Sequence, residues 1–482
     1  MKLSELLEGI SYTGVCPDVE IAQVACDTRS MAPPCVFVCI KGARFDGHDH
    51  AKKATENGAA AIVCAHDTGE PNQMIVENPR EVYARMCAAL YGHPSKRLKL
   101  IGVTGTNGKT TITCLLKHIL ENAGKKVGLI GTIHNEIDDM SLPAKHTTPD
   151  PAELHALFAR MAEAGCEYVV METSSHAFDQ DRLAGCHFEA GVFTNLTQDH
   201  LDYHGTMENY FAAKKKLFSM SKHGIINIDD AYGLRLLGTV PCETHTFSVS
   251  NHTADFFAEE VVQHARGVDF KLVSRAGAEQ VRFGMPGSFS VSNAMAAAAC
   301  LLVLGLDLSA VADGLNTCPG VKGRAEVLPT DSDFTVICDY AHSPDGLEKV
   351  FTAVQGFATG RVVALFGCAG DRDRTKRPKM VRAVAAHSDF MVITSDNPRR
   401  EDPMQIINDA LEGLEGYDVP YQVIDRREAI LWALDHAQKD DVLVLAGKGH
   451  EDYQVLGECT VHFDEHEIVK EYFEKKRAAK QG

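Results

Sequence analysis

The sequence predicts an α/β protein of three domains built on mainly parallel sheets. Its 482 residues are too many for a single hydrophobic core. Short apolar runs of strand length alternate with stretches of helical periodicity, which is typical of βαβ units. A turn-rich linker at Tyr91–Lys96 and a third α/β pattern starting near residue 329 place the domains at 1–96, 97–328 and 329–482.

The composition is that of an ordinary globular protein, with 45% apolar and 24% charged residues. The net charge of −18 argues against a broad nucleic-acid surface, because such surfaces carry basic patches. Residues Met1–Ile10 lack a long apolar core, so we expect no signal peptide. The longest apolar run, Ala294–Leu306, is too short to span a bilayer and predicts a buried helix. Fifteen cysteines without metal-type spacing indicate reduced thiols in a cytoplasm.

The first domain is predicted from three strand-like runs, Cys35–Ile40, Ala59–Ala65 and Met74–Val76, with helical segments around them. Two of its loops, Asp27–Ser30 and Lys41–Gly47, are rich in hydrogen-bonding groups. Such loops serve either as plain turns, which Asp, Ser and Gly favour, or as ligand contacts. The residues alone leave both explanations open.

A glycine-rich turn between a strand and a helix opens the second domain and predicts a nucleotide-phosphate site. Backbone N–H groups at such a turn surround a phosphate, Lys109 adds a positive charge, and Thr110 offers a hydroxyl to magnesium. The general phosphate-loop pattern places a glycine at Val103, whereas this chain has its additional glycine at Gly102. The turn comprises Gly105, Thr106, Asn107, Gly108, Lys109, Thr110 and Thr111.

Polar residues follow two of the later strands of this domain. Glu172–His176 follows one predicted strand and Thr194–His200 follows the next. Carboxylate and hydroxyl oxygens with an imidazole, close to a phosphate loop, suit magnesium. Glu172 and His200 are therefore candidate ligands, and a hydrogen-bonded structural role is the alternative for each. The predicted strands are Val127–Ile130, Tyr168–Met171, Gly191–Phe193 and Ile225–Ile228.

Lys214 stands in an apolar helical stripe formed by Tyr210, Phe211, Leu217 and Phe218. A lysine in that position must extend to solvent, find an anion or lose its charge. Extension to solvent is the usual solution, and chemical modification of the amine is the more specific alternative. Spacing alone does not choose between them.

The third domain is predicted to carry four charged loops on one edge of its sheet. Arginines together with carboxylates and amides suit a zwitterion, because guanidinium binds a carboxylate while carboxylates accept from an ammonium group. Ahead of this domain, Asn293 lies near the start of an alanine-rich helix, where it can be either a cap or an adenine contact. The loops are Asp339–Asp345, Gly370–Arg374, Asp396–Arg399 and Gly447–Glu451, after strands Phe334–Cys338, Val362–Phe366, Phe390–Thr394 and Val442–Leu445.

These motifs together resemble the Mur ligases, the ATP-dependent enzymes that add amino acids during peptidoglycan synthesis. The resemblance covers essentially the full chain, in the family's order. It implies a UDP-binding domain, a central ATPase with a parallel sheet and a Rossmann-like carboxyl-terminal domain. Within the family, the chain is most similar to ligases that add the third peptide residue to UDP-N-acetylmuramoyl-L-alanyl-D-glutamate. The motifs are Gly105–Thr110, Glu172–His176, Thr194–Gly205, Asp339–His342 and Asp396–Arg399.

The resemblance also implies roles for individual residues, with Lys109, Glu172, His200 and Lys214 as the catalytic group. ATP is assigned to the residues from Gly105 to Thr111 with Asn293, Arg324 and Asp339. Mg²⁺ is assigned to Thr110, Glu172, His200 and a Lys214 that CO₂ has carbamylated. The UDP-sugar is assigned to Thr28, Ala43, Arg44, Phe45, His146, Thr147, Thr148, Ser174, Gln180 and Arg182. The added amino acid is assigned to Arg372, Asp396, Asn397, Pro398, Arg399, Gly447 and Glu451.

In this family the run Asp-Asn-Pro-Arg accompanies meso-diaminopimelate, and here Arg399 can pair with the distal carboxylate that lysine lacks. The implied reaction phosphorylates the D-glutamyl carboxylate and then transfers the acyl group to the diaminopimelate amine. Three alternatives remain: the same reaction with L-lysine, a folylpolyglutamate synthetase, and a nucleotide-driven switch or motor. Thr173 and Arg44–Phe45 depart from the family pattern. We expect a cytoplasmic monomer without a membrane span or nucleic-acid partner.

Overall fold

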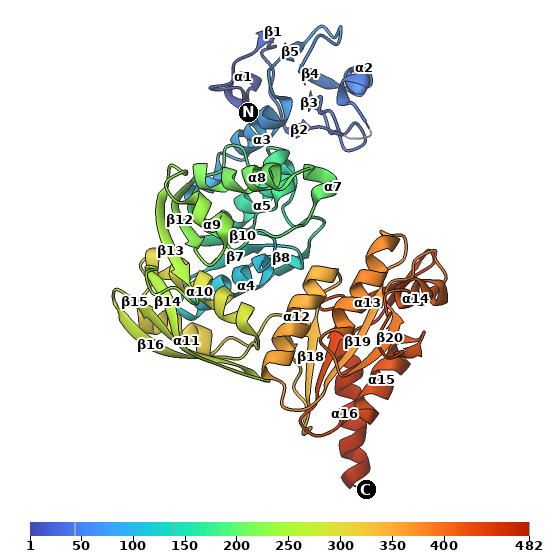
Figure 1. Cartoon of the computed structure of the whole chain (residues 1–482). Coiled ribbons are helices and arrows are strands. Elements are labelled where there is room, and N and C mark those ends of the chain that lie inside the picture. Colours follow the sequence, from blue (N-terminus) through green and yellow to red (C-terminus); the bar gives the residue numbers. More distant parts are fainter. Residues whose placement is uncertain (43–44, 139, 482) are drawn as a thin grey trace. The chain divides into compact units, whose positions relative to one another are not determined.

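The computed structural model describes residues 1–42, 45–138 and 140–481, so Ala43 and Arg44 of the predicted sugar-nucleotide set lie outside the described residues. Figure 1 shows the course of the chain and its labelled elements. The chain divides into two compact units. The first unit comprises Met1–Asp255 and Ala296–Ala310. The second comprises Phe256–Met295 and Val311–Gly482. Each unit is described by itself below.

The amino-terminal domain of the first unit is a small sheet in the order β1-β5-β4-β3-β2, parallel except for β1. One hydrophobic core joins the sheet to α1 and α3, and Asn78 caps α3 by accepting from the N–H groups of Arg80 and Glu81. The elements are α1 (Leu3–Leu6), β1 (Thr13–Gly14), β2 (Gln23–Ala25), β3 (Cys35–Val38), η1 (Gly47–His50), α2 (Ala51–Glu56), β4 (Ala59–Cys64), β5 (Gln73–Ile75), α3 (Pro79–Leu90) and η2 (Pro94–Arg97).

The central domain places the phosphate turn in the middle of a sheet ordered β13-β12-β11-β6-β10-β7-β8-β9. Strands β13 to β7 are parallel, and β8 and β9 are antiparallel. The elements are β6 (Lys99–Thr104), α4 (Lys109–Asn122), β7 (Val127–Ile130), β8 (His134–Ile137), β9 (Met140–Pro143), α5 (Pro151–Glu163), β10 (Tyr168–Glu172), α6 (Ser175–Asp179), β11 (Phe188–Phe193), α7 (Leu201–His204), α8 (Met207–Ser219), β12 (Ser221–Asn227), α9 (Ala231–Leu236) and β13 (Glu243–Ser248).

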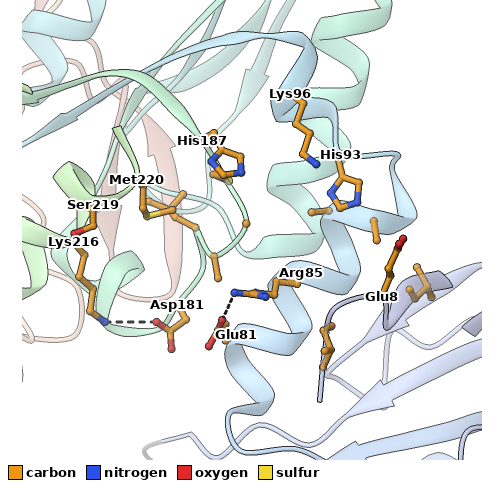
Figure 2. A pocket seen from close by; sticks show the side chains of 18 of the residues that line it. Glu8, Glu81, Arg85, His93, Lys96, Asp181, His187, Lys216, Ser219 and Met220 are labelled. Carbon is orange, nitrogen blue, oxygen red and sulfur yellow. Dashed lines mark ion pairs between the residues drawn. The ribbon is translucent and has the colours of Figure 1, made fainter. Parts of the chain in front are cut away.

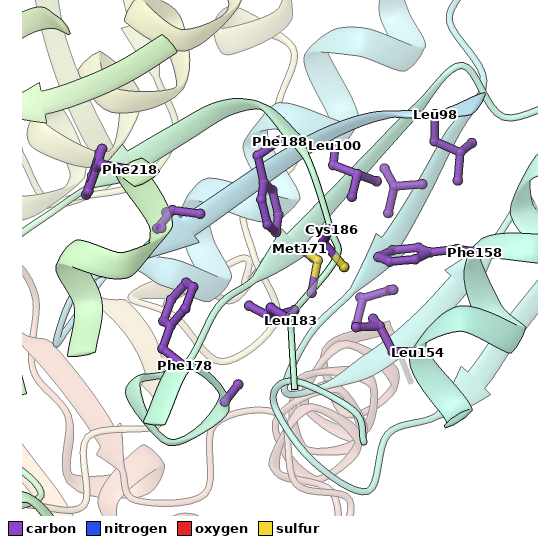
Figure 3. Packing of buried hydrophobic residues seen from close by; sticks show 14 of the residues in the cluster. Leu98, Leu100, Leu154, Phe158, Met171, Phe178, Leu183, Cys186, Phe188 and Phe218 are labelled. Atoms are coloured by element: carbon purple, nitrogen blue, oxygen red, sulfur yellow. The ribbon is translucent and has the colours of Figure 1, made fainter. Parts of the chain in front are cut away.

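One face of this sheet is covered by a core in which Leu100, Phe158 and Phe188 are almost fully buried (Figure 3). Burying such a side chain stabilises the fold by about 1.5–3 kcal/mol. Packing in this core also explains why residue 102, in the strand before the phosphate turn, is a glycine. A Cβ atom at Gly102 would lie 2.9 Å from Leu217 and from Phe188, so this glycine serves strand packing rather than phosphate binding.

The second unit contains three antiparallel strands, β14 (Phe256–His264), β15 (Gly267–Ser274) and β16 (Gly277–Phe283). Two helices follow along the chain, α10 (Ser288–Val303) and α11 (Leu308–Asn316). Each of these helices has residues in both units. Its larger sheet has the order β17-β18-β22-β19-β20-β21, parallel except for β17, with a separate β23–β24 hairpin. The elements are β17 (Glu326–Val327), β18 (Thr335–Asp339), α12 (Pro344–Phe357), β19 (Val362–Cys368), η3 (Arg374–Lys376), α13 (Arg377–Ala385), β20 (Phe390–Ser395), α14 (Pro403–Leu411), β21 (Tyr421–Val423), α15 (Arg426–His436), β22 (Val442–Ala446), β23 (Tyr453–Leu456), β24 (Cys459–His462) and α16 (Glu465–Gln481).

Alternate residues of the larger sheet face helices on opposite sides. Ile337 packs with α12, α13 and α14, whereas its neighbours Val336 and Cys338 pack with α15 and α16. Two of the helices begin at a capping side chain followed by proline, at Ser343 and Asp402. The parallel, doubly covered sheet explains why the strands read as continuous apolar runs in the sequence.

The structure confirms the α/β class and the predicted strands. Residues 294–301 of α10 are buried, as the alanine-rich run predicted. All fifteen cysteines of the sequence are free thiols. Within the described parts of the chain, no helix combines the length and the apolar character needed to cross a membrane.

Candidate functional site

The phosphate turn requires its two glycines. Gly105 has φ of +148° and Gly108 has φ of +89°, values that favour glycine. A Cβ atom at Gly105 would also lie 1.8 Å from the hydroxyl oxygen of Thr194. Helix α4 begins directly after the turn at Lys109, with Thr110 and Thr111 buried in its first turn. The turn is therefore shaped as a strand–helix junction whose N–H groups can meet an anion.

The segment that follows β11 supports this turn from the side. The N–H of Thr106 donates to the carbonyl of Asn195 at 2.9 Å, and the N–H of Asn107 donates to its side-chain oxygen at 3.0 Å. The Thr194 hydroxyl donates to the carbonyl of Asn107 at 2.6 Å. The conformation of the turn is therefore stabilised by residues that are distant from it in the sequence.

Two lysine amines meet at the carbonyl of Gly105. The Nζ atom of Lys109 donates to it at 3.0 Å, and the Nζ atom of Lys214 donates to it at 2.7 Å. Lys214 is 1% exposed, and its amine lies 4.6 Å from the ring centre of Tyr210. Burial, reinforced by the charge of Lys109, holds the pKa of Lys214 well below its usual range. Lys214 thus does not extend to solvent, and its buried environment opposes the charged form of its amine.

Glu172 is fixed beside the first turn of α4. It is 1% exposed, and its Oε1 atom accepts from the N–H of Thr132 at 2.8 Å and from the hydroxyl of Thr110 at 3.1 Å. Its Oε2 atom accepts from the Thr132 hydroxyl at 3.0 Å. A Cβ atom at Gly131 would lie 2.7 Å from the carboxylate, so this glycine makes room for it. Sequence reasoning missed Thr132, although it follows the Val127–Ile130 strand as Glu172 follows its own strand.

Part of the predicted sugar-nucleotide set forms a hydrogen-bonded chain with Glu172. The Thr148 hydroxyl donates to the carbonyl of Glu172 at 2.9 Å and accepts from the N–H of Ser174 at 3.0 Å. Arg182 donates to the carbonyl of Thr148 at 2.8 Å and to the Gln180 side chain at 2.8 Å. This chain places predicted substrate contacts next to the phosphate turn.

The other described members of that set occupy more open positions. The hydroxyls of Thr147 and Thr132 lie 3.1 Å apart, and His146 next to Thr147 is exposed. Thr28 lies in a turn, and its carbonyl accepts from the Asn57 side chain at 3.4 Å. Phe45 is 74% exposed. Both residues lie in the amino-terminal domain.

His200 lies at the start of α7 with φ of +52°, a conformation that turns the chain sharply there. Its ring meets the edge of His176, with ring centres 5.0 Å apart. Burial lowers the pKa of His200, and the charges of Lys109 and Lys214 add to this effect against the opposing charge of Asp199. The neutral imidazole, with a free lone pair for a cation or a proton, is therefore favoured.

In the second unit, predicted nucleotide contacts adjoin the loop that follows β22. The buried carboxylate of Asp339 accepts from the N–H groups of Ala325 and Ala341, each at 2.7 Å, and the Asp339 carbonyl accepts from the N–H of Gly447 at 2.9 Å. The Arg324 guanidinium lies 4.8 Å from the ring centre of Tyr340. Burial raises the pKa of Asp339 despite the charge of Arg324. Asn293 is buried inside α10, which begins at Ser288, so it is not the cap of this helix.

A buried lysine connects three of the predicted amino-acid contacts. The Nζ atom of Lys448 lies 3.3 Å from the Asp396 carboxylate, 3.2 Å from the Asn397 side-chain oxygen and 3.3 Å from the Glu451 carboxylate. It also donates to the carbonyl of Tyr453 at 2.8 Å. Sequence reasoning did not select Lys448, although it lies between two glycines in the loop that supplies Gly447 and Glu451. Its full burial is a property of the fold, which the sequence pattern does not show.

Arg372 lies in the loop that starts at Gly370, and Arg399 contacts this loop. Arg399 has φ of +51°, and its Nη1 atom donates to the carbonyl of Gly370 at 2.8 Å. A Cβ atom at Gly370 would lie 1.9 Å from the carbonyl oxygen of Pro398, so the two loops pack backbone to backbone. Arg372, two residues further along that loop, is exposed. The predicted amino-acid set is thus gathered at the carboxyl ends of β19, β20 and β22.

A cavity of about 780 Å³ lies in the first unit, apart from these groups (Figure 2). Arg85 of α3 pairs with Glu81 at 2.7 Å, and Lys216 of α8 pairs with Asp181 at 3.6 Å. Among the described residues, its lining includes no member of the predicted nucleotide, metal or sugar-nucleotide sets. Its charged groups pair mainly with one another.

Comparison with protein-family models places the chain in a ligase family over most of its length. A model described as "Mur ligase middle domain" matches residues 103–301, one described as "Mur ligase, glutamate ligase domain" matches residues 323–449, and one described as "Mur ligase family, catalytic domain" matches residues 20–99. The chain therefore belongs to the Mur ligase family, as the sequence motifs predicted.

Similar proteins of known name refine this assignment. The UDP-N-acetylmuramoyl-L-alanyl-D-glutamate–2,6-diaminopimelate ligase 1 of Clostridium acetobutylicum is 47% identical, over 98% of this chain and 100% of its own length. The enzyme of that name from Clostridium botulinum is 43% identical, over 98% of this chain and 99% of its own length. A solved structure of such a ligase is 32% identical, covers 99% of both chains and has a TM-score of 0.75.

Proposed function

We infer that the chain is an ATP-dependent ligase that adds meso-diaminopimelate to the D-glutamyl residue of UDP-N-acetylmuramoyl-L-alanyl-D-glutamate. Near-full-length relatives named for this reaction carry the inference. The geometry supports it, because one unit holds a phosphate turn beside buried Glu172 and Lys214, and the other gathers the Asp396–Arg399 loop around Lys448. These are the two halves that an acyl-phosphate ligase needs: a phosphoryl-transfer site and an amine-binding pocket.

The first step is the attack of the free D-glutamyl side-chain carboxylate on the γ-phosphorus of ATP, which yields an acyl phosphate and ADP. The protein has to align these groups and offset their charge, because phosphoryl transfer needs little other chemistry from the enzyme. The turn N–H groups and the start of α4 face the phosphates, and Lys109 exchanges its carbonyl partners for phosphate oxygens. Asn293, Arg324 and Asp339 are proposed as further ATP contacts.

Magnesium fits the donor groups of the first unit. Thr110 and Glu172 place two oxygens 3.1 Å apart, and His200 is favoured in its neutral form. These residues, with a carbamylated Lys214, would hold the ion, which supplies positive charge to the phosphates when bound. Lys214 suits carbamylation because burial holds the pKa of its amine well below the usual range, and the neutral amine is the form that attacks CO₂ to give a carbamate and one proton. The product is an anion in place of an amine whose positive charge burial opposes.

The sugar-nucleotide substrate is proposed to lie along the Thr147–Thr148 segment and Arg182, with Thr28, Phe45 and the remaining predicted residues completing its site. Arg182 supports this role because its guanidinium is held by Gln180 and Thr148 and suits an anionic group. The chain of bonds from Arg182 through Thr148 to Glu172 then leads from the sugar nucleotide to the phosphoryl-transfer site.

In the second step, the diaminopimelate amine attacks the acyl carbon through a tetrahedral intermediate, and phosphate leaves as the amide forms. Asp396, Asn397 and Glu451 offer acceptors for the ammonium ends of the amino acid, held in place by Lys448. Arg399 is proposed to bind the distal carboxylate. L-Lysine would leave this guanidinium without its partner, at a cost of about 1–3 kcal/mol.

The decisive experiment measures ADP release with the UDP-muramoyl dipeptide and either amino acid. We expect turnover with meso-diaminopimelate to exceed that with L-lysine by tenfold or more, and equal turnover would refute the selectivity argument. Folate substrates should be inactive, because a separate α/β domain precedes the phosphate turn, which argues against a folylpolyglutamate synthetase. ADP release without any amino-acid substrate would instead favour a switch or motor. We further propose domains at 1–96, 97–328 and 329–482 and a cytoplasmic monomer.

A further inference from the structure

His223, Glu243 and His245 form a cluster on two neighbouring parallel strands of the first unit. His223 lies on β12, and Glu243 and His245 lie two residues apart on β13. The register pairs His223 with Glu243, and side chains alternate along a strand, so all three project from one face of the sheet. One potential ligand atom of each residue lies within 4.8 Å of the other two.

The cluster is separate from the ligase site. Glu243 and His245 are at the beginning of β13, and His223 is near the beginning of β12. The phosphate turn follows the carboxyl end of β6, and Glu172 is the last residue of β10; both strands are parallel to β12 and β13. The cluster therefore occupies the opposite edge of the same sheet, and the ligase mechanism makes no use of it.

The spacing of the donor atoms matches the coordination shell of zinc. The Nε2 atom of His245 lies 3.3 Å from the Nδ1 atom of His223, which lies 3.3 Å from one carboxylate oxygen of Glu243. The other oxygen of Glu243 lies 3.7 Å from His245. Two donor atoms bound tetrahedrally at about 2.05 Å from Zn²⁺ are about 3.3 Å apart.

We propose that His223, Glu243 and His245 bind a divalent transition-metal ion of the Zn²⁺ type, with solvent completing the coordination. Two imidazoles and a carboxylate are a ligand set that Zn²⁺ accepts. The side chains of His223 and His245 are 15% and 22% exposed, so their rings are held by the fold, while Glu243, at 66%, leaves a path for the ion. The bound ion joins β12 to β13 and stabilises the edge of the sheet that lies away from the ligase chemistry.

The test uses the full-length chain, freed of metal with a chelator, and ZnCl₂ as the probe. Calorimetric titration in saturating Mg²⁺ should show one Zn²⁺ per chain, and Co²⁺ in its place should give the intense visible bands of low-coordinate cobalt. His223→Gln and His245→Gln should each weaken binding by tenfold or more. The matched control is His264→Gln on β14, where His264 also lies near a carboxylate, Asp269, at 3.7 Å. It should leave binding unchanged.

A second measurement keeps the proposal open to refutation if a variant is less stable. A Zn²⁺ concentration one hundred times the dissociation constant should raise the melting temperature of the wild-type chain by about 5 °C, and that of the double variant hardly at all. Ligase turnover should be the same in all of these proteins. Equal Zn²⁺ affinity in the wild type and in His223→Gln/His245→Gln, or no stoichiometric binding by the wild type, would reduce the cluster to a hydrogen-bonded group of side chains.

Discussion

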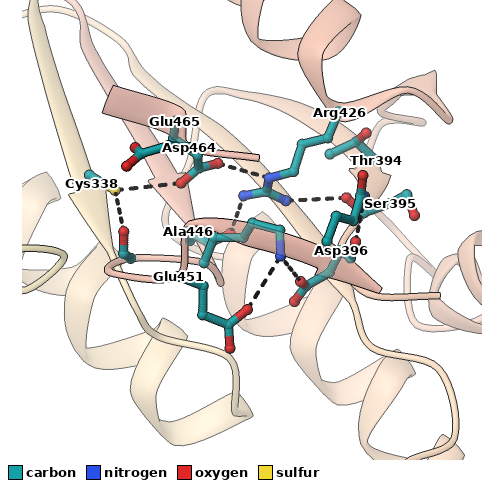
Figure 4. A network of polar contacts seen from close by, with 12 residues as sticks. Cys338, Thr394, Ser395, Asp396, Arg426, Ala446, Glu451, Asp464 and Glu465 are labelled. Atoms are coloured by element: carbon teal, nitrogen blue, oxygen red, sulfur yellow. Dashed lines mark hydrogen bonds and ion pairs between the residues drawn. The ribbon is translucent and has the colours of Figure 1, made fainter. Parts of the chain in front are cut away.

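Arg426 is a fully buried cation that connects three parts of the second unit (Figure 4). Its Nε atom pairs with the buried Glu465 carboxylate at 2.8 Å, and its Nη2 atom donates to the carbonyl of Ala446 at 2.8 Å. A longer bond of 3.5 Å reaches the carbonyl of Ser395. Because Ser395 precedes Asp396 and Ala446 precedes Gly447, one guanidinium holds two loops of the proposed amino-acid pocket against α16.

Arg426→Met should destabilise the second unit by about 4 kcal/mol. The change leaves Glu465 buried without its cation, and removing one partner of such a pair costs about 3–5 kcal/mol. Loss of the strong bond to Ala446 adds about 1 kcal/mol, and the new apolar contacts of methionine offset part of the total. In the double variant Arg426→Met/Glu465→Gln no charge is left unpaired, so we expect about half of the stability to return. The two substitutions should therefore be strongly non-additive.

The chain has a single tryptophan, which makes the assay local. Trp432 lies on α15, the helix that Arg426 begins, and stacks on Tyr421 with ring centres 4.1 Å apart. Its fluorescence during urea unfolding reports the second unit. The control is Arg427→Met, which removes the neighbouring exposed pair with Glu471 and should cost less than about 1 kcal/mol. A loss for Arg426→Met no larger than that of the control would refute the reasoning.

Three further predictions concern the proposed chemistry and its pH range. Lys214→Ala should abolish ligase activity, and crystals of the wild-type enzyme should show additional density on the Lys214 amine; an active alanine variant would remove this residue from the metal site. Arg399→Ala should raise the KM for diaminopimelate at least tenfold and leave that for ATP nearly unchanged, whereas a parallel rise in both would contradict a specific pocket role. Burial lowers the pKa of His466, but hydrogen bonds and charges from Glu326 and Asp464 raise it above its ordinary value overall. Its stabilising effect is therefore complete below pH of about 6.5 and lost as the pH rises through the raised folded-state pKa, so the urea midpoint should fall across that window in the wild type and not in His466→Gln.

Local sequence patterns were sufficient for the strands, the phosphate turn and the family. An apolar run of strand length, a glycine at positive φ and a polar cluster after a strand are all defined by neighbouring residues, so they can be read without the fold. Gly105 and Gly108 are examples, because the backbone conformation of the turn itself demands them. Ligands of a parallel sheet bind at the carboxyl ends of its strands, and this rule is sufficient to predict Glu172 and Asp396 as candidate site residues.

The pattern around Lys214 predicted an unusual lysine but could not decide its fate. Its burial depends on Gly105, 109 residues earlier in the chain, and on Lys109 beside it. Thr132 could not be predicted from the sequence either, because only the pairing of β7 with β10 brings it to Glu172, 40 residues away.

The sequence by itself determined the order of strands and helices, the conformation of the phosphate turn and the chemical types of residue at each strand end. Only the tertiary structure decided which of these residues meet. Lys448 became the centre of a pocket through Asn397, 51 residues earlier, and His223 met His245 through the pairing of two strands. The physical reason is that backbone preferences act between neighbours, whereas burial and charge pairing depend on contacts that the chain makes only once its sheets have formed.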